Sequence, residues 1–149
     1  MSISNIKITI SILYTLFLMG CSLNTLKYKN RLKEGQALLN PISETVYTEV
    51  SSSEVDLKIL SINGQSTSLF SFSNTHIVKA GDVEFLVRCY YNNRKSFTKF
   101  KLNLKSKKVY TIRAIAHNKE TTFNVLTNEK IIATKSVKTK LLHREGINF

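Results

Sequence analysis

Alternation of apolar and polar residues constrains the fold of this chain more than any other feature. From Val83 to Tyr91, every second side chain is apolar. Successive side chains of a β-strand point to opposite faces, so the pattern predicts a strand with one buried face and one face in water. The segment from Phe97 to Leu104 alternates in the same way. No helical period of comparable length competes after residue 54.

Turn signals separate the short apolar runs in this region. Asn63-Gly64 is the strongest of them, because both residues tolerate the positive φ of a tight hairpin. Further turns are expected at 79–82, 92–95, 105–108 and 118–119. About seven short strands, with turns every 8–12 residues, are typical of a β-sandwich. We therefore expect an all-β, mostly antiparallel β-sandwich over residues 54–137, followed by a basic tail over residues 138–149.

Residues 21–53 are expected to form a linker. Its apolar residues at 26, 32, 37 and 39 have the spacing of a short helix, and Asn40-Pro41 would end that helix. The β-branched content of residues 45–50 favours a strand. The basic residues at 27, 29, 31 and 33 have two interpretations: a solvated linker, or attraction to anionic lipid head groups.

An apolar run of about a dozen residues, Ile8 to Met19, follows Lys7 near the N-terminus. A bilayer-spanning helix needs roughly 20 apolar residues, so this run is too short to span. Its length and position are typical of a signal peptide, which we expect over residues 1–20, with removal from the mature chain. The alternative interpretation is a buried core helix.

The run ends in Leu18-Met19-Gly20-Cys21, which resembles the lipobox of bacterial lipoproteins. The resemblance implies cleavage between Gly20 and Cys21, a diacylglyceryl thioether on Cys21 and palmitate-type acylation of the new amine. More than one acyl chain gives stable membrane anchoring. In that family an aspartate after the cysteine retains the protein at the inner membrane. Ser22 at this position therefore implies a lipid-anchored protein of the bacterial cell envelope, on the outer membrane where the cell has one.

A second resemblance covers about residues 55–126. The segment from Ile77 to Val87, with its turn at Ala80-Gly81, is similar to a step found in small PEGA-like β-sandwich modules of surface proteins. The preceding Asn63-Gly64 turn and the later strand from Lys108 to Ala114 fit the same pattern. The resemblance implies an architecture and a non-catalytic role, without a ligand.

Residues that commonly carry catalysis or bind metals show no recognisable arrangement. Cys89 is the second of two cysteines and falls on the inward face of its expected strand, so it is interpreted as a core thiol; the alternative is a reactive or dimerising thiol. The histidines at 76, 117 and 143 lack metal-ligand spacing, and the five glycines form no phosphate-binding loop. We expect no enzymatic activity, no metal and no cofactor.

Charge is the remaining signal: Lys+Arg is 22 against 10 Asp+Glu, a formal net charge of +12. Residues 94–108 contain no acid and form what we name the basic ridge: Arg94, Lys95, Lys99, Lys101, Lys105, Lys107 and Lys108. One interpretation is a solvated face in a lysine-rich chain. The other is a site for an anionic ligand of the envelope, such as lipid head groups, lipopolysaccharide or a wall polymer. An exported protein meets little nucleic acid, so no nucleic-acid partner is expected.

These observations favour a non-catalytic, membrane-anchored envelope lipoprotein with a structural or protein-interaction role. The alternative is a binding module for an anionic envelope ligand through the basic ridge. An enzyme would require polar groups that converge from distant strands, which the sequence does not indicate. The partner and the oligomeric state are left open.

Overall fold

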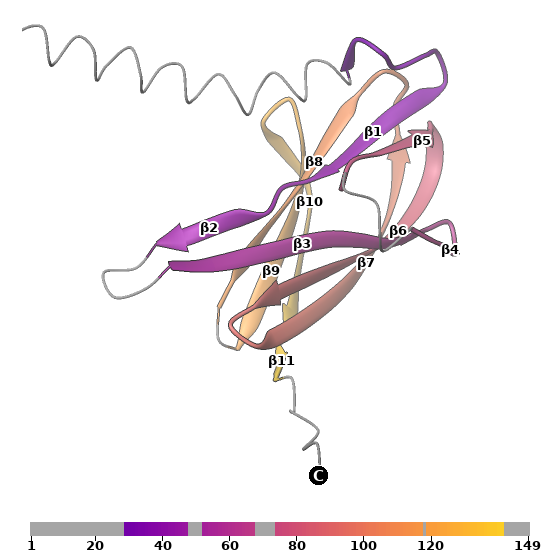
Figure 1. The fold of residues 1–149 in the computed structure, drawn as a ribbon. Helices are drawn as coiled ribbons and strands as arrows, with labels where there is room; N and C mark the ends of the chain where they lie inside the picture. Colours follow the sequence, from indigo (N-terminus) through magenta and orange to yellow (C-terminus); the bar gives the residue numbers. More distant parts are fainter. Residues whose placement is uncertain (1–28, 48–51, 68–73, 118, 142–149) are drawn as a thin grey trace, which may run out of the picture.

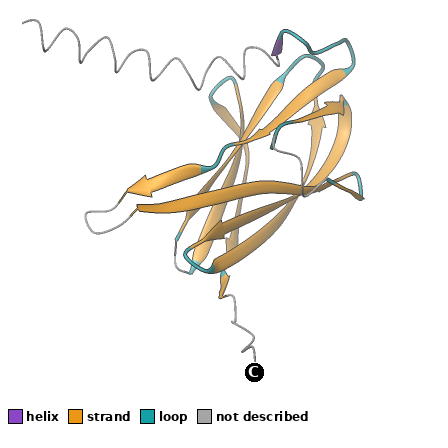
Figure 2. Ribbon diagram, in the orientation of Figure 1, coloured by secondary structure: helices purple, strands orange, loops and turns teal. Residues whose placement is uncertain are grey.

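The computed structural model describes residues 29–47, 52–67, 74–117 and 119–141. This part of the chain forms two β-sheets that pack together, which confirms the expected all-β sandwich (Figures 1 and 2). The strands are β1 (Gln36–Pro41), β2 (Glu44–Tyr47), β3 (Ser52–Ile62), β4 (Gln65–Ser66), β5 (His76–Lys79), β6 (Gly81–Tyr91), β7 (Arg94–Leu104), β8 (Val109–Ala116), β9 (Glu120–Thr127), β10 (Lys130–Lys138) and β11 (Lys140–Leu141).

The first sheet has the strand order β10-β9-β8-β1-β5, and the second has the order β11-β7-β6-β3-β2, with β4 paired to β3. Among these pairs, only β1 and β8 run parallel; the others are antiparallel, as the alternation predicted. Among the described strands, the chain passes from one sheet to the other after β1, β4, β5, β7 and β10.

The core lies between the sheets and is built from the inward positions of the alternating strands. On β6, burial alternates along the strand from Val83 to Cys89, as the sequence pattern requires. Phe85 on β6 and Phe100 on β7 stack with ring centroids 5.5 Å apart. Phe123 and Val125 on β9 are fully buried in the same cluster from the opposite sheet. Burial of these large apolar side chains supplies the main driving force for folding.

Three two-residue turns have positive φ at both central positions. They are Asn63-Gly64, Asn92-Asn93 and Asn128-Glu129, with φ between 46° and 78°. Two positive φ angles define a type I′ turn, whose twist matches that of the flanking strands. The hairpin expected at Asn63-Gly64 is confirmed, because Ile62 pairs with Gln65 across it.

The expected helix does not continue to Asn40-Pro41, because residues 36–41 form strand β1 between β8 and β5. Ala37, Leu38 and Leu39 are all fully buried, so β1 is covered on both faces. A strand buried on both faces lacks alternation, and its apolar run resembles one side of a helix. The Asn40-Pro41 pair lies at the end of this strand rather than after a helix.

The described strands extend beyond the expected domain boundaries at 54 and 137. Leu32 is already buried, and β1 and β2 both precede residue 52, so the folded domain begins well inside the expected linker. At the other end, Lys140 and Leu141 of the expected tail pair with Lys95 and Arg94 of β7. The strand count therefore exceeds the expected seven, because short pairings at the sheet edges leave little periodicity in a sequence.

Candidate functional site

The basic ridge lies along β7 and the turn that joins it to β8. Lys99 and Lys101 are exposed on the outer face of β7, as expected from the alternation. The turn carries the exposed Lys105, Lys107 and Lys108. At the other end of β7, Arg94 and Lys95 are only half-exposed, because β11 lies beside them.

A carboxylate from the neighbouring strand lies in the middle of the ridge. The β6–β7 register sets Glu84 opposite Lys101. The Glu84 carboxylate is 2.7 Å from Lys99 Nζ and 3.1 Å from Lys101 Nζ. Hydrogen bonds from Lys99 and then from Lys101 hold the pKa of Glu84 below its usual value. The centre of the ridge is therefore mixed in charge, although no acid is present in its own sequence segment.

A second acid, Glu34, reaches the turn end of the ridge. Lys107 Nζ lies 2.7 Å from Glu34 Oε2, and Ser106 Oγ donates a hydrogen bond of 3.0 Å to Glu34 Oε1. The hydrogen bonds from Lys107 and Ser106 lower the pKa of Glu34. Exposed ion pairs of this kind contribute little to stability, so their main effect is on the distribution of charge.

Four ridge residues keep their charge uncompensated by a nearby acid. Arg94, Lys95, Lys105 and Lys108 form no ion pair with any described carboxylate. Lys95 also lies directly opposite Lys140 of β11, and like charges at opposite positions of two strands repel. The ridge is thus divided into a mixed centre and two strongly positive ends.

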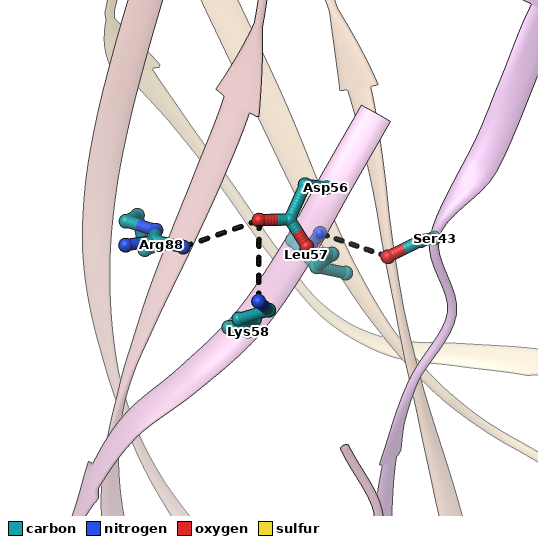
Figure 3. A network of polar contacts seen from close by, with 5 residues as sticks. All are labelled: Ser43, Asp56, Leu57, Lys58 and Arg88. Atoms are coloured by element: carbon teal, nitrogen blue, oxygen red, sulfur yellow. Dashed lines mark hydrogen bonds and ion pairs between the residues drawn. The ribbon is translucent and has the colours of Figure 1, made fainter. Parts of the chain in front are cut away.

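Further along the outer face of the same sheet, Asp56 of β3 forms a small charged network (Figure 3). Its Oδ2 lies 3.1 Å from Arg88 Nη2 and 3.8 Å from Lys58 Nζ. The backbone N–H of Leu57 donates to Ser43 Oγ at 3.0 Å, which ties the segment before β2 to β3. All three charged side chains are partly exposed, so the network is part of a solvated surface.

An open groove of about 330 Å³ lies between the Asn63 turn and the paired strands β6 and β7. Polar groups along the groove form hydrogen bonds with one another. Asn63 Oδ1 accepts a hydrogen bond from the Glu84 N–H at 2.9 Å, and Asn103 Nδ2 donates to Asp82 Oδ1 at 2.8 Å. Since Glu84 is also held by two lysines, the acids of this groove are engaged in local structural contacts.

Cys89 is 1% exposed and faces the core from β6, which confirms its expected inward position. Burial raises the pKa of its thiol to about 11. A thiol must ionise to act as a nucleophile or to form a disulfide. The geometry therefore favours the core-thiol interpretation.

The two described histidines lie on different strands. His76 of β5 is half-buried, and burial lowers its pKa. His117 is exposed after the end of β8, and its backbone N–H donates to the Glu120 carbonyl. His143 lies outside the described residues. In the described ranges, no group of three or more His, Cys, Asp or Glu side chains is placed to hold a metal ion.

The expected signal peptide over residues 1–20 and the lipidation residues Gly20 and Cys21 lie outside the described part of the chain. Across the residues that are described, no helix has the length and apolar character needed to cross a bilayer. No family model, curated protein or solved structure matches this chain. The resemblances to bacterial lipoproteins and to PEGA-like modules therefore stay predictions.

Proposed function

We propose that this protein is a non-catalytic lipoprotein of a bacterial cell envelope, anchored to the membrane through Cys21. In this role the β-sandwich is held near the membrane and serves a structural or protein-interaction function. The observation that carries the proposal is the Leu18-Met19-Gly20-Cys21 sequence after an apolar run of signal-peptide length.

The short distance along the chain between Cys21 and the folded domain supports this role. Leu32 is the first buried residue described, and it follows Cys21 by 11 residues. A fully extended segment of that length reaches at most about 40 Å. With β1 in the core, the anchor would hold the domain close to the bilayer rather than at the end of a long linker.

The state of the two cysteines also fits the proposal. Cys89 is enclosed by the core, so it is a poor substrate for acylation or for a disulfide. Cys21 is then the cysteine available for modification. The two described histidines lie on different parts of the fold, and Glu34, Asp56, Asp82 and Glu84 are held in separate local contacts, which is consistent with a non-catalytic domain.

The proposal is tested by the intact mass of the protein extracted from its native membrane with detergent. The expected mass corresponds to residues 21–149 plus acyl chains. Cys21→Ala should abolish both the added mass and membrane fractionation, whereas the matched variant Cys89→Ala should retain both. A mass that begins at Met1 without acyl chains, or unchanged fractionation of Cys21→Ala, contradicts the proposal.

A second candidate function is binding of an anionic envelope ligand through the basic ridge. The observation in its favour is the set of four ridge cations without an acidic partner among the described residues. We expect retention on dextran sulfate beads to fall with added salt. Lys105→Gln with Lys108→Gln should weaken retention more than Lys99→Gln with Lys101→Gln, because Glu84 already compensates the second pair. Equal effects of the two pairs would argue against a localised site.

A further inference from the structure

Three segments that are far apart in the sequence meet at the end of the sandwich where the N-terminal segment enters β1. The Gly35 N–H donates to Ser106 Oγ at 2.9 Å, and the Lys107 N–H donates to the Gln36 carbonyl. The Ala80 N–H donates to the Gly35 carbonyl at 2.7 Å. Residues 29–36, the β7–β8 turn and the β5–β6 junction therefore form one surface, which we name the tether-side end.

The β9–β10 turn lies at the same end. β8 begins just after the β7–β8 turn, and its Thr111 pairs with Leu126 near the end of β9. Figure 1 shows the β9–β10 turn and the β8 end on the side of the molecule where the N-terminal segment enters. The tether-side end thus extends across the first sheet, from β5 to β10.

This end is strongly basic. Eight of its lysines and arginines are exposed, against three acids, and one of the acids, Glu34, is paired with Lys107. The basic residues are Lys29, Arg31, Lys33, Lys79, Lys105, Lys107, Lys108 and Lys130; the acids are Glu34, Asp82 and Glu129. They come from four separate segments of the chain, so the cluster is produced by the fold rather than by one charged run.

Exposed aliphatic side chains accompany these charges. A bulge at the start of β10 leaves two consecutive isoleucines, Ile131 and Ile132, 53% and 43% exposed directly after Lys130. Ile77 of β5, two residues before Lys79, is 47% exposed. Basic side chains beside exposed apolar ones are the combination that binds the head-group region of a membrane.

We propose that the tether-side end is a docking surface for an anionic lipid bilayer. The inference rests on the proposed function, because an anchor at Cys21 would bring this end, rather than the opposite one, toward the membrane. The lysines and arginines would attract anionic head groups, each contributing about fivefold in affinity near such a surface. The exposed isoleucines would enter the interface. Docking fixes the orientation of the sandwich and turns the opposite end toward other components of the envelope.

The opposite end provides a matched control. It carries Arg94, Lys95, Lys119, Lys138 and Lys140, so it is also basic. It also has exposed apolar side chains, at Phe97, Ile115 and Leu141. What distinguishes the two ends is that the N-terminal segment enters the fold at the other one. A comparison of charge reversals at the two ends separates a specific docking surface from a general effect of net charge.

The test uses the polypeptide 22–149, which contains all the described strands but lacks Cys21. Its sedimentation is measured with vesicles of phosphatidylglycerol and phosphatidylcholine, and with vesicles of phosphatidylcholine alone, at ~0.1 M salt. The tether-side variant combines Lys105→Glu, Lys108→Glu and Lys130→Glu. The control variant combines Lys95→Glu, Lys138→Glu and Lys140→Glu. A third variant, Ile131→Ser with Ile132→Ser, tests the apolar contribution.

The wild-type polypeptide should sediment with the anionic vesicles and not with the neutral ones. The tether-side variant should lose at least about tenfold in binding, and the control variant less than about threefold. The isoleucine variant should lose the binding that persists at higher salt. Circular dichroism checks the fold, and Lys→Gln versions at the same positions replace any variant that does not fold.

Absence of wild-type binding, retention of binding in the tether-side variant, or equal losses in both charge variants would overturn the docking surface. These outcomes are independent of lipidation, because the polypeptide has no acylation site. A failed intact-mass experiment would instead contradict the anchor and leave the vesicle result intact.

Discussion

Cys89 illustrates how a single position in the core controls the chemistry of a side chain. Its inward place follows from the alternation along β6, and its burial raises the pKa of the thiol to about 11. The ordinary value is 9.0, so between these two pH values the unfolded chain releases a proton that the folded chain retains. The contribution of Cys89 to stability is therefore fully present below pH 9.0 and is lost as the pH rises toward about 11.

We expect Cys89→Ala to change this dependence. The variant should be less stable than the wild type at pH 7, by about 1–2 kcal/mol, because it leaves a small cavity in the core. Between pH 9 and 11 the free energy of unfolding of the wild type should fall more than that of the variant, by about 1–3 kcal/mol. Urea unfolding of the polypeptide 22–149 across this pH range measures both effects. Parallel pH profiles for the two proteins would contradict the raised pKa.

At the scale of a single element, the β9–β10 turn contains the least suitable residue for its backbone conformation. Glu129 has φ of 64° in a type I′ turn whose preceding residue is Asn128. The left-handed conformation is costly for a residue with a Cβ, and Asn-Gly is the preferred pair for such a turn. We expect Glu129→Gly to raise stability by about 1 kcal/mol, equivalent to an increase in Tm of about 4 °C.

Asn93→Gly is the matched control for this prediction. Asn93 has a similar φ of 56°, but asparagine tolerates the left-handed region better than glutamate. Thermal unfolding should therefore show a smaller gain for Asn93→Gly than for Glu129→Gly. A loss of stability in Glu129→Gly would mean that the greater flexibility of glycine in the unfolded chain outweighs the relief at this turn.

The elements that the sequence predicted well are those exposed on one face. β6 and β7 alternate cleanly, so their inward residues were identified before the fold was known. β1 was missed because burial on both faces removes the alternation. Glu84 was missed as a partner of Lys99 and Lys101 because cross-strand contacts depend on register. The sequence predicted a four-residue turn at 92–95, whereas the structure has a two-residue turn at Asn92-Asn93. This shorter turn sets the β6–β7 register in which Glu84 lies opposite Lys101.

For the whole molecule, the position of β1 determines where the domain can be cut. A chain that starts at Glu54, the boundary expected from the sequence, lacks Ala37, Leu38 and Leu39, which are fully buried. Loss of a buried leucine costs about 2–5 kcal/mol, and a typical domain has only about 5–15 kcal/mol of stability. We expect residues 54–149 to fail to fold, whereas residues 29–149 should fold.

Circular dichroism and urea unfolding of the two polypeptides check this prediction. The polypeptide 29–149 should unfold cooperatively, and the polypeptide 54–149 should show no cooperative transition. A stable fold in the shorter polypeptide would show that the second sheet, with the rest of the first, is sufficient without β1.

The parallel pairing of β1 with β8 has a consequence for the order of folding. Leu38 lies opposite Val109, so β1, the first of the described strands to leave the ribosome, finds this neighbour only after strands β2 to β7 have been made. Contacts between distant segments form slowly, since a long loop must close before they become favourable. Until then the apolar segment from Ala37 to Leu39 stays without its parallel neighbour and is prone to aggregate. We therefore expect folding of this chain to benefit from a chaperone that covers β1 until β8 is available.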